Sequence, residues 1–224
     1  MNPFADARAV ARYAAETPAK VPGFDDLHRM ATILLSENAP ADARILVVGA
    51  GGGLELRAMA RLRPDWRFVG VDPAEPMIAI AHETTAEFSD RIELVVGTVD
   101  QLDLSLFDGA TCLLTLHFLE REDRLATLRE IHRRLRPGSI LACAHHCAIA
   151  PDPAAWIARS IVFARGSTYP DGTAVEASSA MMGRVTLLAP DEEEGLLREA
   201  GFADVKEFYS ALSFRGFIGV RHAV

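Results

Sequence analysis

The chain has 224 residues, of which 50% are hydrophobic and 24% charged, the composition of a globular protein with a substantial core. It contains no run of 18 apolar residues and no leader with a cleavage site, so we expect neither a membrane span nor a secretory signal. The net charge of −8 argues against a broad nucleic-acid-binding surface, and three cysteines, an odd number, do not form a disulfide framework. A reducing cytoplasm is the expected setting.

The predicted elements alternate between helices and strands. The N-terminal helical segment is predicted over residues 1–40. Its Ala-rich first part, 1–23, ends in the turn signal Val21-Pro22-Gly23, and a helix follows over 24–36. Strands are predicted at 45–48, 67–71, 91–96, 110–116 and 139–144, and the helices between them at 54–63, 75–88 and 121–135, the last ended by Arg136-Pro137-Gly138. This alternation predicts an α/β fold, a doubly wound parallel sheet with helices on both faces, in a single domain spanning 1–224.

The pattern loosens over residues 150–190, where prolines break it into short helical pieces. A helix then begins at Pro190 and ends at Ala200-Gly201, and strands follow at 203–209 and 212–220. Loosely patterned inserts over an α/β sheet often carry substrate sites, so we expect 150–190 to cap the substrate.

The most informative stretch is 45–53, Ile-Leu-Val-Val-Gly-Ala-Gly-Gly-Gly, together with Asp72 at the end of the next predicted strand. A glycine-rich turn between a buried strand and a helix lets a ligand approach the backbone, and an acid after the second strand accepts hydrogen bonds from ribose hydroxyls. The unit predicts nucleotide binding. A glycine-rich turn in some other α/β protein is the alternative.

Four motifs resemble those of the class I S-adenosylmethionine-dependent methyltransferases. They are Val-Gly-Ala-Gly-Gly-Gly at 48–53, Val-Gly-Val-Asp-Pro at 69–73, Leu-Arg-Pro-Gly-Ser at 135–139 and Leu-Leu-Arg-Glu-Ala-Gly-Phe at 196–202. The resemblance covers about the whole chain. It implies a Rossmann-like, mostly parallel seven-stranded sheet with an antiparallel last strand, and S-adenosyl-L-methionine as cofactor.

Three further segments resemble the enzymes that transfer a carboxymethyl group to wobble uridine of tRNA from carboxy-S-adenosylmethionine. They are Val-Pro-Gly-Phe-Asp at 21–25, Thr-Leu-His-Phe-Leu-Glu at 115–120 and the aromatic tail at 207–214. Those enzymes hold the extra carboxylate with a tyrosine and an arginine. Here Phe24 and, in an approximate register, Ser178 stand at these positions, and neither offers a charge-assisted bond. We therefore expect the ordinary cofactor.

The resemblance also implies the cofactor site. The glycines approach the methionine part and ribose, Asp72 holds the ribose hydroxyls, Pro73 and Met77 line the adenine, and Thr98 and Val99 lie at its amino group. The expected cofactor-binding residues are Gly49, Ala50, Gly51, Gly53, Asp72, Pro73, Met77, Thr98, Val99 and Leu114.

Two histidines are candidate catalytic residues. His117 follows the fourth strand and His145 ends the fifth, at the sheet edge where ligands bind, and an imidazole suits removal of a proton from a hydroxyl or amine. The alternative for each is a structural histidine whose ring is satisfied by a neighbouring backbone group. Cys143, His146 and Cys147 add metal-ligand types, but neighbouring strand residues point to opposite faces, so we expect no metal.

The sequence thus predicts methyl transfer to a small-molecule acceptor. A tRNA-modifying (carboxy)methyltransferase, a non-catalytic nucleotide-binding partner subunit and a dehydrogenase are the alternatives, and a homodimer is among the expected assemblies. The arginines at 129, 133, 134 and 136 are interpreted as a solvated helix face rather than a nucleic-acid patch.

Overall fold

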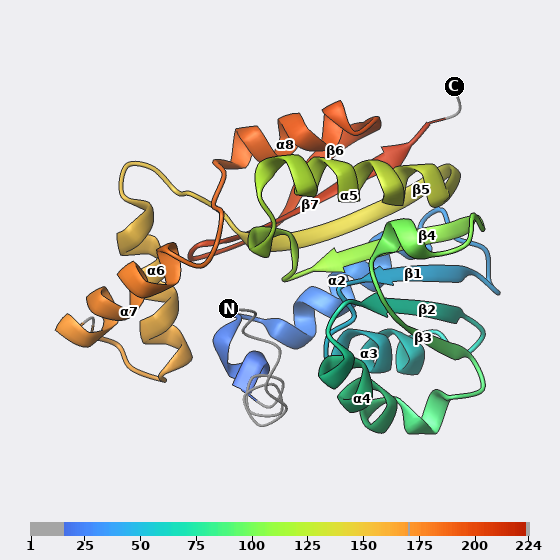
Figure 1. The fold of residues 1–224 in the computed structure, drawn as a ribbon, viewed down its shortest axis with the longest axis horizontal. Helices are drawn as coiled ribbons and strands as arrows, with labels where there is room; N and C mark the ends of the chain where they lie inside the picture. Colours follow the sequence, from blue (N-terminus) through green and yellow to red (C-terminus); the bar gives the residue numbers. More distant parts are fainter. Residues whose placement is uncertain (1–15, 170, 223–224) are drawn as a thin grey trace.

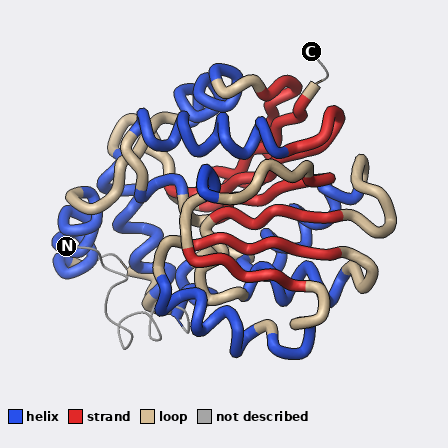
Figure 2. Tube along the Cα trace, turned by 45° about the vertical axis from the view of Figure 1, so that its right-hand side comes forward, coloured by secondary structure: helices blue, strands red, loops and turns tan. Residues whose placement is uncertain are grey.

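A seven-stranded sheet forms the centre of the computed structural model, which describes residues 16–169 and 171–222 (Figures 1 and 2). The strands lie in the order β3-β2-β1-β4-β5-β7-β6. Their bounds are Arg44–Val48 (β1), Arg67–Asp72 (β2), Ile92–Val96 (β3), Phe107–Leu113 (β4), Leu135–His146 (β5), Phe202–Ala211 (β6) and Phe214–Arg221 (β7). The first five strands pair in parallel, and β7 runs antiparallel to β5 and β6. The predicted fold is confirmed.

Helices cover both faces of this sheet because its buried strands carry apolar side chains on both faces. On one face, α2 (Phe24–Ser36) and α3 (Leu54–Leu62) pack against Ile45 and Val47, with α4 (Glu75–Thr84) beside them. On the other, α5 (Arg121–Arg134) lies against β5 and α8 (Pro190–Glu199) against β6 and β7, over the cluster that includes Leu46 and Val48 (Figure 1). The carboxyl ends of β1 to β5 therefore meet at one edge, between the two helical layers.

The largest differences from the predicted elements are in β4 and β5. The fourth strand was expected at 110–116 but ends at Leu113, because Leu114 has a φ of 59° and the chain turns there into a 3-10 helix, η3 (Leu116–Phe118). The fifth begins at Leu135, directly after α5, because Leu135 pairs with Phe107 across a register shift. The Arg-Pro-Gly turn thus lies inside the first part of β5. The helix expected at 75–88 is divided into α4 and η1 (Ala86–Phe88).

The insert between β5 and α8 contains two helices, α6 (Pro153–Ala164) and α7 (Gly172–Met182), which pack on each other and lie beyond the carboxyl edge of the sheet (Figure 1). Asp152 and Asp171 accept hydrogen bonds from the backbone N–H groups of Ala155 and Ala174, which fixes where the helices begin. Within the described chain, none of the helices has the length and apolar character that crossing a membrane requires. The first part of the predicted N-terminal segment, residues 1–15, is outside the described residues.

One carboxyl group lies in the apolar layer between α3 and the sheet. Glu55, in the first turn of α3, is buried, and desolvation raises the pKa of its side chain from 4.5 to about 8, with the Thr111 hydroxyl opposing this shift. The folded protein therefore holds this proton more tightly than the unfolded chain does. The group contributes stability that is complete below the unfolded pKa of 4.5 and is lost as the pH rises to about 8.

We predict that Glu55→Gln removes this pH dependence. The difference in unfolding free energy between variant and wild type should change by about 1.4 kcal/mol per pH unit in favour of the variant as the pH rises between the two pKa values. Urea denaturation at several pH values measures it. The difference between proteins is the useful quantity because His28, His117 and His146 have lowered pKa values and titrate in the opposite sense. Glu75→Gln, at an exposed first-turn position of α4, is the matched control, and parallel curves for Glu55→Gln and wild type would contradict the prediction.

Candidate functional site

The glycines between β1 and α3 have three different structural roles. Gly49 has a φ of 73°, and a Cβ there would lie 2.0 Å from the Thr115 Oγ1, so only glycine allows the end of β4 to approach. Gly53, the N-cap of α3, would place a Cβ 3.0 Å from the Cα of Ala81 on α4. At Gly51 the nearest atom would be the Gly49 carbonyl oxygen at 3.8 Å. The protein thus leaves space at Gly51, where a ligand can lie against the backbone.

Asp72 holds this turn in place from the end of β2. Its Oδ2 accepts a hydrogen bond of 2.9 Å from the Gly51 N–H, and its Oδ1 accepts one of 2.9 Å from the Ala74 N–H at the start of α4. Burial raises the pKa of the carboxyl, and these two hydrogen bonds oppose the shift. Each oxygen has a second lone pair, so the carboxylate can also accept bonds from a ligand's hydroxyl groups.

The other expected cofactor residues lie around the same carboxyl edge. Ala50 and Met77 are buried, and Pro73 is exposed. Val99, in the 3-10 helix η2 (Val99–Gln101), is buried beside exposed Thr98. Thr98 caps that helix, and its own N–H donates a hydrogen bond to the Oε1 of Gln101. Leu114 is half-buried, and its N–H donates to the Ala144 carbonyl at 2.5 Å. The expected ribose and adenine positions are therefore adjacent, with the Thr98 side chain already used by the protein.

The two candidate catalytic histidines lie in different surroundings. His117, in η3, is buried, and its ring lies 5.1 Å from that of His146, centroid to centroid. Burial lowers the pKa of His117 well below its usual value, and the charges of His146, His145 and Arg124 lower it further. His145 instead places its Nε2 3.0 Å from Glu193 Oε1 on α8. The neighbouring β5 residues point to opposite faces as expected, and His146 rather than His145 contacts His117.

Glu193 also forms a buried ion pair with Arg124 of α5, whose second guanidinium nitrogen donates to the carbonyls of Leu119 and Thr186. Ligand atoms of His145, Cys147 and Glu193 lie within 4.8 Å of one another. Arg124 already balances the charge of Glu193, so this group is an ion-pair cluster that joins the end of the insert to α5 and α8.

Several polar residues at this edge were not predicted as site residues. Ser213 Oγ, in the β6–β7 turn, lies 2.7 Å from His146 Nδ1 and 2.6 Å from Ser160 Oγ on α6. His28 on α2 is buried edge-on against Phe24, and burial lowers its pKa to about 4. Single serines and histidines on apolar helices or in turns carry no pattern, so only the folded arrangement shows that Ser160, Ser213 and His146 meet.

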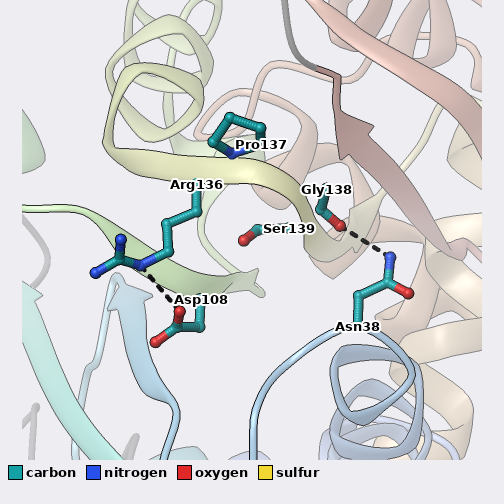
Figure 3. Close-up of a pocket in the computed structure, with 6 residues that line it drawn as sticks. All are labelled: Asn38, Asp108, Arg136, Pro137, Gly138 and Ser139. Atoms are coloured by element: carbon teal, nitrogen blue, oxygen red, sulfur yellow. Dashed lines mark hydrogen bonds and ion pairs between the residues drawn. The ribbon is translucent and has the colours of Figure 1, made fainter.

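Two surface cavities lie at the opposite, amino edge of the sheet. The larger, of about 400 Å³, is lined by Asn38, Asp108, Arg136, Pro137, Gly138 and Ser139 (Figure 3). Asn38 donates to the Gly138 carbonyl, and Arg136 pairs with Asp108 at 3.0 Å. The smaller, of about 270 Å³, includes Arg44 and Arg67 at the starts of β1 and β2. Ligands of open α/β sheets bind at the carboxyl edge, so these cavities are not the cofactor site.

Comparison with known proteins places the fold among the Rossmann-like methyltransferases. The methyltransferase domain family matches residues 45–138, the segment that contains the glycine-rich turn and Asp72. The structure of human N-acetylserotonin methyltransferase, solved with S-adenosylmethionine, superposes with a TM-score of 0.62 at 14% identity over 88% of this chain and 52% of that one. The 1,6-didemethyltoxoflavin-N1-methyltransferase of Burkholderia thailandensis, solved with S-adenosylhomocysteine, gives 0.61 at 21% identity over 88% and 79%. This chain thus spans about half the length of the human enzyme. These findings agree with the cofactor expected from the sequence.

Among curated proteins, the chain is 28% identical to the carboxy-S-adenosyl-L-methionine synthase of Chromohalobacter salexigens, over 97% of this chain and 83% of that protein. A similar synthase from Aeromonas hydrophila is 24% identical over 90% and 83%. The expected resemblance to the enzymes that transfer a carboxymethyl group to tRNA needs correction. These relatives are named for making the carboxylated cofactor, not for transferring its carboxymethyl group to tRNA.

Two glycine variants should separate ligand binding from folding. Gly51→Ala should weaken cofactor binding at least tenfold, because the new methyl group occupies the space left for the ligand. Its backbone strain should cost about 1–2 kcal/mol of stability. Gly53→Ala should instead lower stability more, because its Cβ meets the α4 backbone. Calorimetry with S-adenosylhomocysteine and thermal denaturation measure the two effects, and equal ligand affinity in Gly51→Ala and wild type would contradict the proposed position.

Asp72→Ala should weaken binding of the same ligand by about 1–3 kcal/mol, because hydroxyl groups of the ligand and the Gly51 N–H lose their shared acceptor. Glu75→Ala, three residues along the chain and exposed, is the matched control. Wild-type affinity in Asp72→Ala would remove this carboxylate from the site.

Proposed function

We propose that this protein is an S-adenosylmethionine-dependent methyltransferase acting on a small-molecule acceptor. The observation that carries the proposal is the open backbone at Gly51, held by the Asp72 carboxylate at the carboxyl edge of β1 and β2. A Cβ would fill this cradle, and the family match covers the whole strand–turn–helix–strand unit around it. The residues present fit an adenosine-bearing ligand.

Methyl transfer asks little else of the protein. The sulfonium is an activated donor, and catalysis consists mainly of aligning acceptor, methyl and sulfur. In this proposal the cofactor lies across β1, β2 and β3, and the acceptor lies under the 150–190 insert, beside His117. The insert is anchored next to that position, since the Thr186 N–H donates to the His117 carbonyl.

A second candidate is synthesis of the carboxylated cofactor, which the curated relatives favour because they match almost the whole chain. The side chains at the two positions expected to hold a carboxylate speak against it. Phe24 is buried against His28, and Ser178 is buried with its hydroxyl donating to the Val175 carbonyl. Neither supplies a cation or a free donor.

A tRNA substrate receives no support from the arginines of α5 and of the start of β5. Arg133 and Arg134 pair with Glu130, Arg136 pairs with Asp108, and Arg129 lies 3.6 Å from Glu199. Arg129, Arg133 and Arg136 are exposed beside these acids, as a solvated face requires. Arg134 is the exception, because it is buried and its guanidinium donates to the carbonyls of Asp100 and Leu102. The cytoplasmic setting and the homodimer stay predictions.

Calorimetry with S-adenosylmethionine, S-adenosylhomocysteine and NAD tests the proposal. We expect the first two to bind and NAD not to bind, whereas NAD binding alone would favour a dehydrogenase. Incubation with methyl-labelled cofactor and a metabolite extract then tests transfer. Labelled product with wild type but not with Asp72→Ala is the expected result. Binding without any product would favour a non-catalytic subunit.

We further predict that the ordinary cofactor binds more tightly than carboxy-S-adenosylmethionine. Burying the additional carboxylate near Phe24 without a cation costs several kcal/mol. Competition calorimetry measures the preference, and Phe24→Tyr, which restores a hydroxyl donor, should reduce it. Tighter binding of the carboxylated form by wild type would overturn the prediction and favour the chemistry of the synthases.

A further inference from the structure

A chain of three buried polar side chains joins the insert to the carboxyl edge of the sheet. Ser160 of α6 lies 2.6 Å from Ser213, oxygen to oxygen, and Ser213 lies 2.7 Å from the Nδ1 of His146. All three residues are buried, with exposed fractions of 4%, 0% and 7%. Buried hydroxyl and imidazole groups are costly unless they are paired, so these contacts fix each other's geometry.

Two arrangements of the protons are compatible with these distances, and both contain the 2.6 Å bond between the serines and the 2.7 Å bond to His146. In the first, His146 Nδ1–H donates to Ser213, Ser213 donates to Ser160, and Ser160 donates to the Trp156 carbonyl at 3.3 Å. In the second, Ser160 accepts from the Ser213 N–H at 3.3 Å and donates to Ser213 Oγ, and Ser213 donates to His146 Nδ1. The second arrangement leaves the imidazole proton on Nε2.

His146 is also held in orientation and charge. Its ring stacks on Phe214 at 3.8 Å, centroid to centroid, and burial together with the charge of His145 lowers its pKa to about 3. It is therefore a neutral hydrogen-bond donor at physiological pH and a poor base. The hydrogen bond of this ring within the described residues is the one at Nδ1, and the ring adjoins His117 of η3.

We propose that His146 is a binding residue that donates its Nε2–H to an oxygen of the methyl acceptor, and that Ser213 and Ser160 are positioning residues that hold it in this tautomer. The inference rests on the proposed function and specifies its substrate class: an acceptor that presents an anionic oxygen, such as a phenolate, an enolate or a carboxylate. This choice follows from the chemistry of the donor, because an N–H forms a stronger hydrogen bond to an ionised oxygen than to a neutral one.

The transfer balances without a base. The acceptor oxygen forms a bond to the methyl carbon while the carbon–sulfur bond breaks, and the electron pair stays on sulfur. The negative charge of the oxygen and the positive charge of the sulfonium cancel, and no proton has to leave. A neutral donor suits this step because it orients the oxygen without protonating it.

Histidine nitrogen NMR tests the tautomer in the unliganded protein. In ¹⁵N-histidine-labelled protein, with the His146 signals assigned by their loss in His146→Gln, we expect a neutral ring protonated on Nε2 throughout the neutral pH range. Ser213→Ala should shift these signals toward an average of the two tautomers, and Ser213→Thr should restore them. Ser178→Ala removes another buried hydroxyl of the insert and should leave them unchanged. A wild-type proton on Nδ1, or unchanged signals in Ser213→Ala, would overturn the proposal.

A second NMR measurement tests the substrate class. It uses 4-nitrophenolate as an anionic probe, added to the protein with S-adenosylhomocysteine bound. We expect the probe to shift the His146 Nε2–H signal, and the neutral 4-nitroanisole not to shift it. No shift with the phenolate in protein that binds S-adenosylhomocysteine would overturn the assigned substrate class. If S-adenosylhomocysteine itself does not bind while the tautomer is as expected, the proposed function fails rather than the geometry of His146.

Discussion

The double hydrogen bond from Asp72 is the interaction on which the candidate site depends. One carboxylate joins the glycine-rich turn after β1 to the start of α4 after β2. Two backbone segments from different βα units are thereby held at a fixed separation before any ligand arrives. The cost is a carboxylate that has lost part of its hydration, seen in its raised pKa, and a ligand that brings hydroxyl groups relieves this cost. The carboxylate that shapes the turn is thus also a ready acceptor for the ligand.

A second constraint fixes the other half of the site. The fully buried guanidinium of Arg124 pairs with Glu193 and bonds the carbonyls of Leu119 and Thr186, so α5, α8, the end of η3 and the end of the insert are joined at one point. A buried ion pair of this kind adds little net stability, but removing one partner leaves an uncompensated charge. Its effect is to place the return of the insert against His117. The opposite end of the insert is joined by the serine pair between α6 and the β6–β7 turn.

Much of the fold could be predicted from the sequence because it depends on local patterns. The apolar run at Ile45–Val48, the glycines after it and the amphipathic helix at 24–36 each define an element within a few residues. The end of β4 could not be predicted, since nothing in the sequence shows that Leu114 adopts a positive φ. The residues of the site also fall into a part that the sequence predicts and a part that it does not. Asp72 was expected from its spacing, whereas the contact between His146 and Ser213, 67 residues apart, and the pair of Arg124 with Glu193, 69 residues apart, arise only from tertiary packing.

Burial keeps several histidine side chains of this protein uncharged. Burial lowers the pKa values of His28, His117 and His146, so all three rings stay neutral in an interior where an imidazolium would be costly. A general base works best when its pKa lies near the ambient pH, so lowered pKa values suit these rings to hydrogen bonding more than to proton removal. Neutral imidazoles keep their hydrogen-bonding capacity and add no charge beside a sulfonium. An edge with fixed neutral donors, a balanced ion pair and an open backbone at Gly51 is suited to aligning a nucleophile that arrives already ionised.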